Sequence, residues 1–340
     1  MNVALAYNSK KNKPSKNLEE QSDLEFDSPS VTKAQKDALE SFGHKVILVN
    51  ADEHAFLRLK DLKGKIDIVF NVAEGLWGEA RESQIPLFCE VLKIPYTHSS
   101  PLTHAIALDK SYTKHALKGA DVANVPASQA ISSKDYKIDK DLKFPLIVKP
   151  NKEGSSKGVL DSNVVHDLKR LKQRIKEVSE SFTKEIVVEE YIEGREFTVS
   201  LLGNDNPKIL PIVEQRFDFL PKGMNKIASF ELKWVYEDSL TDLKDAYYCP
   251  AKLSKALKKE IDDTSLEIYK FFEVRECARI DYRLGINGKL YFLEINTLPG
   301  MMPPEENSIS YFPLAARTAG MNFTDLIGEI LALACKRYGI

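Results

Sequence analysis

The sequence predicts an α/β fold that begins with a parallel sheet, and two observations carry this prediction. Strand-like apolar runs alternate with helical patterns over the N-terminal third of the chain, which is typical of parallel strands joined by crossover helices. The chain has 340 residues, of which 43% are hydrophobic and 29% charged, as in soluble globular enzymes. Its length leaves room for about two or three domains.

The first predicted unit contains strands, a helix and a glycine-rich turn. A long polar segment, residues 8–26, exceeds the usual length of a βα loop, so it is either a substrate lid or simply mobile. A turn at 72–82 contains Gly75 and Gly78 and leads into an amphipathic stretch at 83–92. The other elements are strands at 3–7, 45–49 and 66–71 and a helix at 30–42 that ends at Gly43.

Two further units are expected. The second contains a helix at 103–118, which carries Asp109 and Lys110, and apolar strands at 146–149 and 186–192. The third contains strands up to Val213, an irregular segment at 232–236, a helix at 254–272, a hairpin and a C-terminal helix at 323–336. The sequence contains no internal repeat.

The hairpin is the most informative stretch of the chain. Its strands, residues 279–281 and 290–295, alternate apolar and polar positions and are joined by a glycine-containing turn. Asp281 is predicted to face Glu294 and Asn296, which lie two residues apart on one side of their strand. Three oxygen ligands that converge in this way suit Mg²⁺ with positions left open for the phosphates of a nucleotide.

Any one of these polar residues would more simply face solvent. The flanking residues favour a functional site instead, because Arg279 lies two residues before Asp281 and so shares its face. The turn at 298–301, Leu-Pro-Gly-Met, exposes backbone N–H groups beside the expected metal. Spacing, turn and cation agree with one another, which indicates a catalytic hairpin.

A Gly/Ser-rich loop at residues 151–158 follows the strand at 146–149. Its backbone N–H groups could surround a phosphate, although such a loop is more often only a turn. Lys149 directly precedes the loop, and the acidic run from Glu189 to Glu196 follows further along the chain. Lysines, loop and acidic strand end are predicted to hold triphosphate, ribose and adenine. The loop is not a P-loop, because G-x-x-x-x-G-K-[ST] does not occur.

Composition excludes several classes of partner. Forty-eight basic and fifty acidic residues leave a formal charge of -2, so no global field attracts nucleic acid or an acidic membrane. The four cysteines are scattered without C-x-x-C pairing, which favours a reducing cytoplasm over a disulfide framework or a zinc site. No signal peptide or membrane-spanning run is expected.

The hairpin resembles that of the ATP-grasp superfamily, and specifically of the D-alanine-D-alanine ligases. In that family an Arg-Ile-Asp strand is followed by a Glu-x-Asn-Thr-x-Pro-Gly-Met strand, and the similarity extends over nearly the whole chain with the motifs in the same order. The resemblance implies an ATP-grasp fold with an N-terminal parallel-sheet domain at 1–98. A central subdomain with the phosphate loop would span 99–196, and a C-terminal catalytic domain 197–340.

The resemblance also implies roles for individual residues. Those expected at ATP are Lys110, Lys149 and Lys233 at the phosphates, Ser155 and Ser156 in the loop, Glu189 at the adenine amine, Glu196 at the ribose, and the backbone near Tyr191 and Ile192 beside adenine. Those expected at the metal are Asp281, Glu294 and Asn296, which would bind two Mg²⁺, with Mn²⁺ able to substitute. Arg279 would stabilise the tetrahedral intermediate, Gly300 would donate an N–H to its oxyanion, and Ser155 and Lys233 would also serve catalysis.

Four departures from the family fall on the amino-acid side of the site. The region 8–30 lacks the family's Gly-Gly-x-Ser-x-Glu-Arg-Glu-Val-Ser motif, whose first glutamate holds an amine. Glu74 stands where the family has a histidine, and its carboxylate would either hold a substrate amine or pair structurally with Arg81. Trp234 replaces a tyrosine and can only donate a hydrogen bond. After Met301 the family's Ser-His-Ser-Leu becomes a longer segment that contains Glu305, whose charge would repel a substrate carboxylate.

The resulting hypothesis is an ATP-dependent carboxylate-amine ligase that works through an acyl phosphate. Formation of D-alanyl-D-alanine, and hence peptidoglycan biosynthesis, is the first substrate expectation, followed closely by the joining of other amino acids, a peptide or an amino-acid-like metabolite. The rivals are a non-catalytic ATP-binding protein of the same fold and an ATP-grasp carboxylase or kinase. Small-molecule substrates, no nucleic acid, no membrane and a homodimer complete the expectation.

Overall fold

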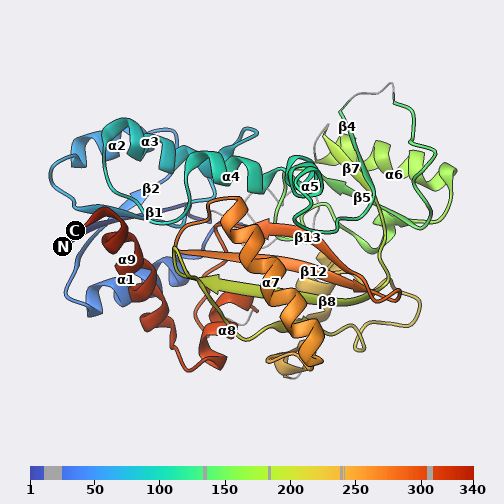
Figure 1. Ribbon diagram of the computed structural model, residues 1–340. Coiled ribbons are helices and arrows are strands. Elements are labelled where there is room, and N and C mark those ends of the chain that lie inside the picture. The colour runs from blue at the N-terminus through green and yellow to red at the C-terminus, as the bar shows by residue number, and fades with distance from the viewer. Residues whose placement is uncertain (11–24, 133–135, 183–184, 238–239, 241, 305–308) are drawn as a thin grey trace.

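The computed structural model describes residues 1–10, 25–132, 136–182, 185–237, 240, 242–304 and 309–340, and these form three β-sheets with helices on their faces (Figure 1). The strands are β1 (Asn2–Tyr7), β2 (Lys45–Asn50), β3 (Ile68–Asn71), β4 (Ser128–Ile131), β5 (Leu146–Pro150), β6 (Val164–Val165), β7 (Ile186–Glu190), β8 (Gly194–Leu202), β9 (Lys208–Ile209), β10 (Val213–Gln215), β11 (Tyr247–Tyr248), β12 (Cys277–Gly285) and β13 (Leu290–Asn296). The helices are α1 (Pro29–Ser41), α2 (Ala55–Leu62), α3 (Gln84–Leu92), α4 (Pro101–Leu108), α5 (Lys110–Gly119), α6 (Leu168–Ser181), α7 (Lys255–Phe271), α8 (Tyr311–Thr318) and α9 (Phe323–Tyr338).

The first sheet is parallel, with the strand order β2-β1-β3, as the sequence predicted. Helices α1 and α9 cover one face, and α2 and α3 cover the other (Figure 1). Leu5 of β1 packs in one core with Leu39 of α1 and Ile327 of α9, whereas its neighbour Ala4 packs in the other core with Leu59 of α2. Burial on both faces explains why β1 is apolar along its length.

The helix predicted at 103–118 is in fact two helices, α4 and α5, because the backbone of Asp109 is extended. The Asp109 carboxylate accepts the backbone N–H of Tyr112 at 2.9 Å and so caps the start of α5. A short acidic side chain that bonds local N–H groups competes with helix continuation, which ends α4 at this point. Lys110 thereby becomes the first residue of α5.

The second sheet has the strand order β4-β7-β5-β6 and is antiparallel. Helix α6 packs on it through Leu171, Ile175 and Val178, which join Val148 of β5 in one core. The sequence prediction omitted this helix, although its N-cap Asp167 and the apolar spacing of three and four residues are both present.

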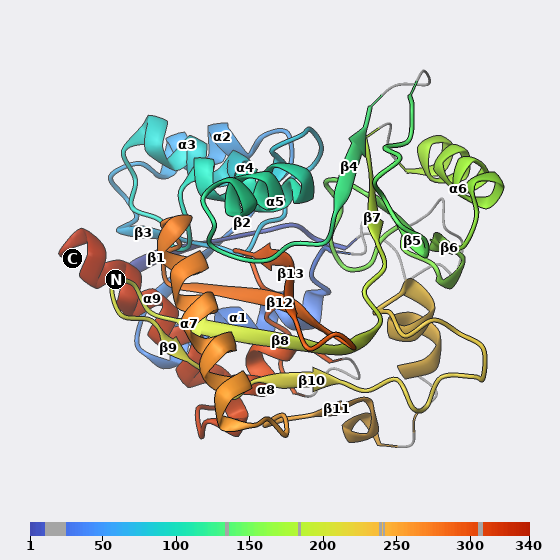
Figure 2. The ribbon, with the colours of Figure 1, turned by 45° about the vertical axis from the view of Figure 1, so that its right-hand side comes forward.

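The third sheet has the order β11-β10-β8-β12-β13, with β9 paired to β8. Helix α7 crosses one of its faces (Figure 1), where Ile261 and Ile268 pack with Ile280 and Tyr282 of β12. Since strand residues alternate between faces, Arg279 and Asp281 lie on the opposite face. Residues 191–193 carry the chain directly from β7 of the second sheet into β8 of the third (Figure 2).

A buried ion pair fastens the C-terminal helix to the rest of the molecule. Glu276, which is 0% exposed, lies 2.8 Å from the Arg337 guanidinium of α9, and its carboxylate also accepts the backbone N–H of His98 at 2.6 Å. This contact joins the first sheet to the start of β12. Among the helices of the described ranges, none combines the length and apolar character needed to cross a bilayer.

Candidate active site

A cavity of about 170 Å³ brings segments from all three sheets together. The third sheet and its connections contribute Lys233, Arg279, Glu294, Asn296 and Gly300, whereas α5 contributes Lys110 and the Gly/Ser loop Ser155. The opposite wall is acidic and consists of Glu25, Asp27, Glu74 and Glu82. Most of the residues expected at phosphate, metal and oxyanion therefore line one cavity together with these carboxylates, whereas Lys149, Ser156 and Asp281 are not among its lining residues.

The hairpin register sets the geometry of the cavity floor. Asp281 lies directly opposite Glu294, and Arg279 lies opposite Asn296. The register shifts between Asp281 and Tyr282. Asp281 pairs with Glu294 but Tyr282 pairs with Phe292, so the β13 residue between these two has no partner in β12. A β-bulge of this kind re-aims side chains beside a site and was not visible in the sequence.

Charges on the hairpin are arranged in alternation. The Arg279 guanidinium lies 3.0 Å from the Asp281 carboxylate and 3.9 Å from that of Glu294, and the Lys110 ammonium lies 3.3 Å from Glu294. Burial acts to raise the pKa of Glu294, but Lys110 and Arg279 outweigh it and hold that pKa at about 2. Burial raises the pKa of Asp281, which also accepts the Thr198 hydroxyl at 2.7 Å.

Arg279 has an unused donor. Its Nε is buried and has no hydrogen-bond partner among the residues that the structure describes. Buried polar groups without a partner are uncommon in folded proteins, and at a cavity wall they indicate a missing ligand. A guanidinium with a free N–H donates it to a bound anion, and the tetrahedral intermediate of an acyl transfer is such an anion.

The Gly/Ser loop has the backbone of a phosphate-binding loop. Ser155 and Ser156 have φ angles of 50° and 60°, in the left-handed region that non-glycine residues seldom adopt. The Ser156 hydroxyl donates to the carbonyl of Ala228 at 2.5 Å, and Lys110 donates to the carbonyl of Glu153 at 2.6 Å. These contacts fix the loop against α5, and successive N–H groups in such a conformation form an anion-binding concavity.

Residues expected at adenine and ribose lie apart from the lining of this cavity within the described chain. Glu189 is 1% exposed and contacts the ammonium groups of both Lys114 and Lys149. Burial acts to raise its pKa, but the two lysines prevail and hold it at about 2. Glu196 lies 2.7 Å from the Arg283 guanidinium.

Tyr191 and Ile192 lie in the connection between β7 and β8, as their expected place beside adenine requires. Lys114, by contrast, was not identified from the sequence. Its signal was the spacing of four residues from Lys110, which places both lysines on one face of α5. The Lys114 side chain is 2% exposed, so its charge is buried with that of Glu189.

The acidic wall shows what Arg81, the expected structural partner of Glu74, contacts. Arg81 contacts Glu25 at 2.8 Å and Glu153 at 3.7 Å, and its guanidinium donates to the Lys152 carbonyl at 2.6 Å. Within the described ranges no ion pair joins Arg81 to Glu74, so the structural pairing is not formed. Burial raises the pKa of Glu74 well above its usual value.

Glu82 lies beside Glu74 and was not identified from the sequence. Burial, opposed by the charge of Arg81, raises its pKa to about 7. Gly75 shapes the turn between these carboxylates, since its φ is +79° and a Cβ atom there would overlap the Arg81 carbonyl. Burial thus disfavours the charged form of both carboxyl groups, and a cation bound between them would favour it.

The structure describes some of the expected site residues only in part or not at all. The side chain of Trp234, Glu305 and most of the predicted lid at 8–26 lie outside the described residues, although Glu25 and Phe26 line the cavity. Ser310 and Tyr311 also line it and were not identified from the sequence. Ser310 caps the start of α8, and its hydroxyl donates to the carbonyl of Gly300.

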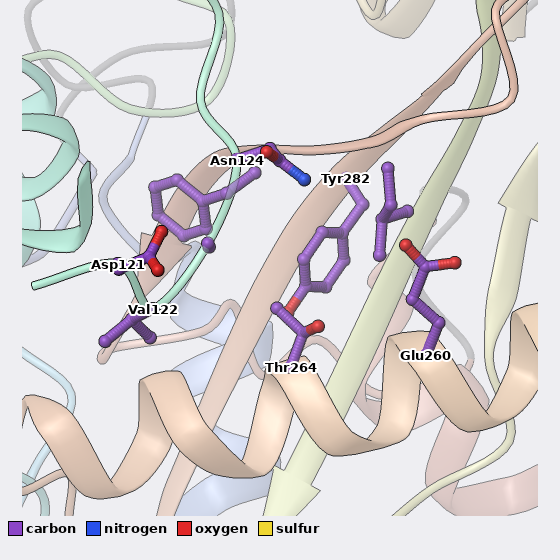
Figure 3. A pocket seen from close by; sticks show the side chains of 9 residues that line it. Asp121, Val122, Asn124, Glu260, Thr264 and Tyr282 are labelled. Atoms are coloured by element: carbon purple, nitrogen blue, oxygen red, sulfur yellow. The ribbon is translucent and has the colours of Figure 1, made fainter.

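A second cavity, of about 130 Å³, lies on the other face of the third sheet (Figure 3). Thr264 and Glu260 of α7 border it, together with Asp121 and Asn124 from the chain after α5. Tyr282, which follows Asp281 in β12, lies in its wall. Because successive strand residues face opposite sides, the sheet separates this cavity from the catalytic hairpin.

Comparison with known proteins identifies relatives of this chain. The family model for the D-ala D-ala ligase C-terminus matches residues 119–332. The D-alanine-D-alanine ligase of Aquifex aeolicus is 33% identical over 302 residues, which covers 88% of this chain and 92% of the relative. That of Fervidobacterium nodosum is 33% identical over 316 residues with the same coverage, and the uncharacterized protein y4sG of Sinorhizobium fredii is 34% identical over 307 residues, 88% of this chain and 86% of the relative.

Among solved structures, D-alanine-D-alanine ligase from Bacillus anthracis, in a complex with ATP, superposes with a TM-score of 0.73 over 100% of this chain and 99% of that one, at 24% identity. This likeness confirms the predicted fold. The sequence matches identify the family, and the chain therefore belongs to the D-alanine-D-alanine ligases, ATP-dependent ligases with the ATP-grasp fold.

Proposed function

We propose that this ATP-dependent ligase phosphorylates the carboxylate of one amino acid and joins the acyl phosphate to the amine of a second. The observation that carries the proposal is the unpartnered Nε of Arg279 in a cavity that also holds Lys110, Lys233 and Glu294. D-alanine is the first substrate to test in both positions. Other amino acids, a peptide or an amino-acid-like metabolite are the alternatives.

Asp281, Glu294 and Asn296 are the proposed ligands of two Mg²⁺ ions, for which Mn²⁺ would substitute. Two carboxylates and an amide on adjacent strands fit Mg²⁺, which keeps positions for water and phosphate oxygens. The described residues contain no group of three or more His, Cys, Asp or Glu that could hold a metal ion by themselves. Bound Mg²⁺ would neutralise charge on the phosphates during transfer.

The cations of the cavity are proposed to act in sequence. Lys110 and Lys233 hold the phosphates of ATP, with Ser155 and Ser156 in the loop above them. Arg279 then neutralises the charge that develops on the substrate carbonyl oxygen, while the N–H of Gly300 donates to that oxygen.

At the nucleotide end, Lys149 is proposed to exchange partners. It contacts Glu189 in this structure, and phosphate would draw its ammonium away while Lys114 stays with the carboxylate. Glu189 would then accept the adenine amine. Glu196 would accept the ribose hydroxyls, and the backbone at Tyr191 and Ile192 would line the adenine slot.

The amine substrate is proposed to bind beside α8. Ser310 and the first N–H groups of α8 face the cavity next to Gly300, and a helix N-terminus attracts a carboxylate. Glu74 would hold an ammonium group at the other end. Trp234 and Glu305 stay proposed as residues that tune the choice of substrate.

We further propose that the chain is organised as units 1–98, 99–196 and 197–340 and assembles as a homodimer through the first unit. Leu87 and Val91, one turn apart on α3, are 49% and 62% exposed. Apolar side chains that share an exposed helix face favour a protein partner. A cytoplasmic location is proposed because the enzyme consumes ATP and its four cysteines are unpaired.

The test is phosphate release by purified protein with ATP and Mg²⁺, across D- and L-amino acids alone and in pairs, with mass spectrometry of the products. Release with D-alanine and a D-alanyl-D-alanine mass supports the family reaction. Release only with other pairs rejects D-alanine and keeps the ligase mechanism. ATP binding without release under any pair rejects the proposal in favour of a binding protein. Phosphate release with bicarbonate favours a carboxylase, whereas ADP and a phosphorylated hydroxyl compound, formed without free phosphate, favour a kinase.

A further inference from the structure

The acidic wall of the cavity contains two carboxylates that lack protein partners. Within the described residues, neither Glu74 nor Glu82 makes a hydrogen bond or an ion pair, although Glu82 is only 8% exposed. Both side chains line the cavity. An unpartnered carboxylate that is this deeply buried costs free energy unless a ligand compensates it.

The cations nearest to the wall are already engaged. Arg81 contacts Glu25 and Glu153, and the Lys110 ammonium lies 3.3 Å from Glu294. The buried guanidinium of Arg81 thus pairs with two carboxylates other than Glu74 and Glu82. Among the described residues, no cation forms an ion pair with Glu74 or Glu82, although the charge of Arg81 acts on both from a distance.

Different charges act on the two carboxylates, and this difference indicates their order along the cavity. The charges of Lys110 and Glu294 act on the pKa of Glu82, whereas the named influences on Glu74 are Glu82, Glu25, Arg81 and Asp27. The packing agrees, because Glu82 belongs to the short helical turn Arg81–Ser83, which contacts α4, and α4 contacts β13 of the hairpin. We therefore place Glu82 on the hairpin side of Glu74. A substrate with its carboxylate at Arg279 would meet Glu82 first.

We infer that Glu82 and Glu74 form a paired amine site and that the carboxylate substrate is an amino acid with two amino groups. This inference rests on the proposed function, since Arg279 is taken to mark the reacting carboxylate. The α-ammonium is placed at Glu82 and the side-chain ammonium at Glu74. Two positive charges would compensate both carboxylates, whereas an amino acid with one amino group would leave one of them uncompensated.

The test compares ornithine with norleucine, in which a methyl group replaces the side-chain ammonium at nearly equal size. Both enantiomers of each are titrated calorimetrically into the full chain, loaded with Mg²⁺ and a non-hydrolysable ATP analogue. Ornithine of the preferred enantiomer is expected to bind about tenfold more tightly than norleucine or better, as for a charge-assisted hydrogen bond in a buried site. The wild-type comparison requires no variant to fold.

Variants then assign the two ammonium groups. Glu74→Gln is expected to remove the preference for ornithine and leave norleucine binding within about twofold, whereas Glu82→Gln weakens both ligands. Glu79→Gln is the matched control, because the Glu79 side chain is 80% exposed on the same turn. It should change neither affinity.

Equal or tighter binding of norleucine would overturn the inference, as would a preference that survives in Glu74→Gln or the failure of both ligands to bind. These results are separable from failure of the proposed function, because binding requires no turnover. Dipeptide formation from amino acids with one amino group and no preference for ornithine keeps the ligase and removes the paired amine site.

Discussion

Replacement of Arg279 by methionine should slow the chemical step far more than it weakens ATP binding. The guanidinium lies 3.0 Å from Asp281 and its side chain is 17% exposed, so its charge acts in a largely desolvated site. Loss of one such donor to a developing oxyanion costs about 3 to 4 kcal/mol, or about 10²- to 10³-fold in kcat. The KM for ATP should change by less than about threefold, because lysines carry the proposed phosphate contacts.

The assay is phosphate release at saturating amino acid with ATP varied, and again at saturating ATP with amino acid varied. Arg170→Met is the control, since Arg170 is exposed on α6 and should keep wild-type kinetics. Arg279→Lys keeps the charge but loses the planar donor pair, so its kcat should lie between those of Arg279→Met and Arg170→Met. A kcat within tenfold of wild type in Arg279→Met, or a KM for ATP that rises as much as kcat falls, would refute the role of Arg279.

Three further outcomes are expected. Glu294→Gln should abolish phosphate release and leave thermal stability near that of wild type, and release at even a tenth of the wild-type rate would count against a metal role. Glu189→Gln leaves the buried ammonium of Lys114 uncompensated and should lower the free energy of unfolding by about 3 to 5 kcal/mol at neutral pH in urea titrations. Because the pKa of Glu189 is lowered to about 2, its stabilisation is present above its unfolded pKa and should vanish as the pH falls from about 4.5 to about 2; a stability difference that is independent of pH would contradict this. Gly75→Ala places a Cβ against the carbonyl of Arg81 at a positive φ and should cost about 1 to 3 kcal/mol, whereas Gly64→Ala, with a similar φ and open space, should cost less.

Local patterns in the sequence identified the catalytic hairpin because its information is local. Alternation placed Asp281 on the side of Glu294, and the pairing in the structure joins these two residues. The parallel sheet was predicted from the alternation of strands and helices, which is also a local pattern. The break at Asp109 was also a local signal, since an N-cap residue lies three positions before the N–H that it binds, but the apolar run around it concealed the break.

The acidic wall could not be derived from the sequence, because its contacts join distant segments. Arg81 and Glu25 are 56 residues apart, and only the fold shows that Arg81 pairs with Glu25 and forms no ion pair with Glu74 among the described residues. Burial of Lys114 with Glu189, 75 residues away, has the same origin. Charged residues in a sequence are expected to face solvent, so the exceptions that make a site appear only when packing is known.

The central claim, amide formation through an acyl phosphate, is tested most directly by isotope transfer. D-alanine with ¹⁸O in its carboxylate, or whichever amino acid supports release, is incubated with ATP, Mg²⁺ and the enzyme, and the phosphate is analysed by mass spectrometry. Attack of the carboxylate on the γ-phosphoryl followed by displacement by an amine must leave one labelled oxygen in the phosphate and one in the amide. That distribution is the predicted result. Phosphate without label, formed while both labelled oxygens stay on the amino acid, would contradict the account.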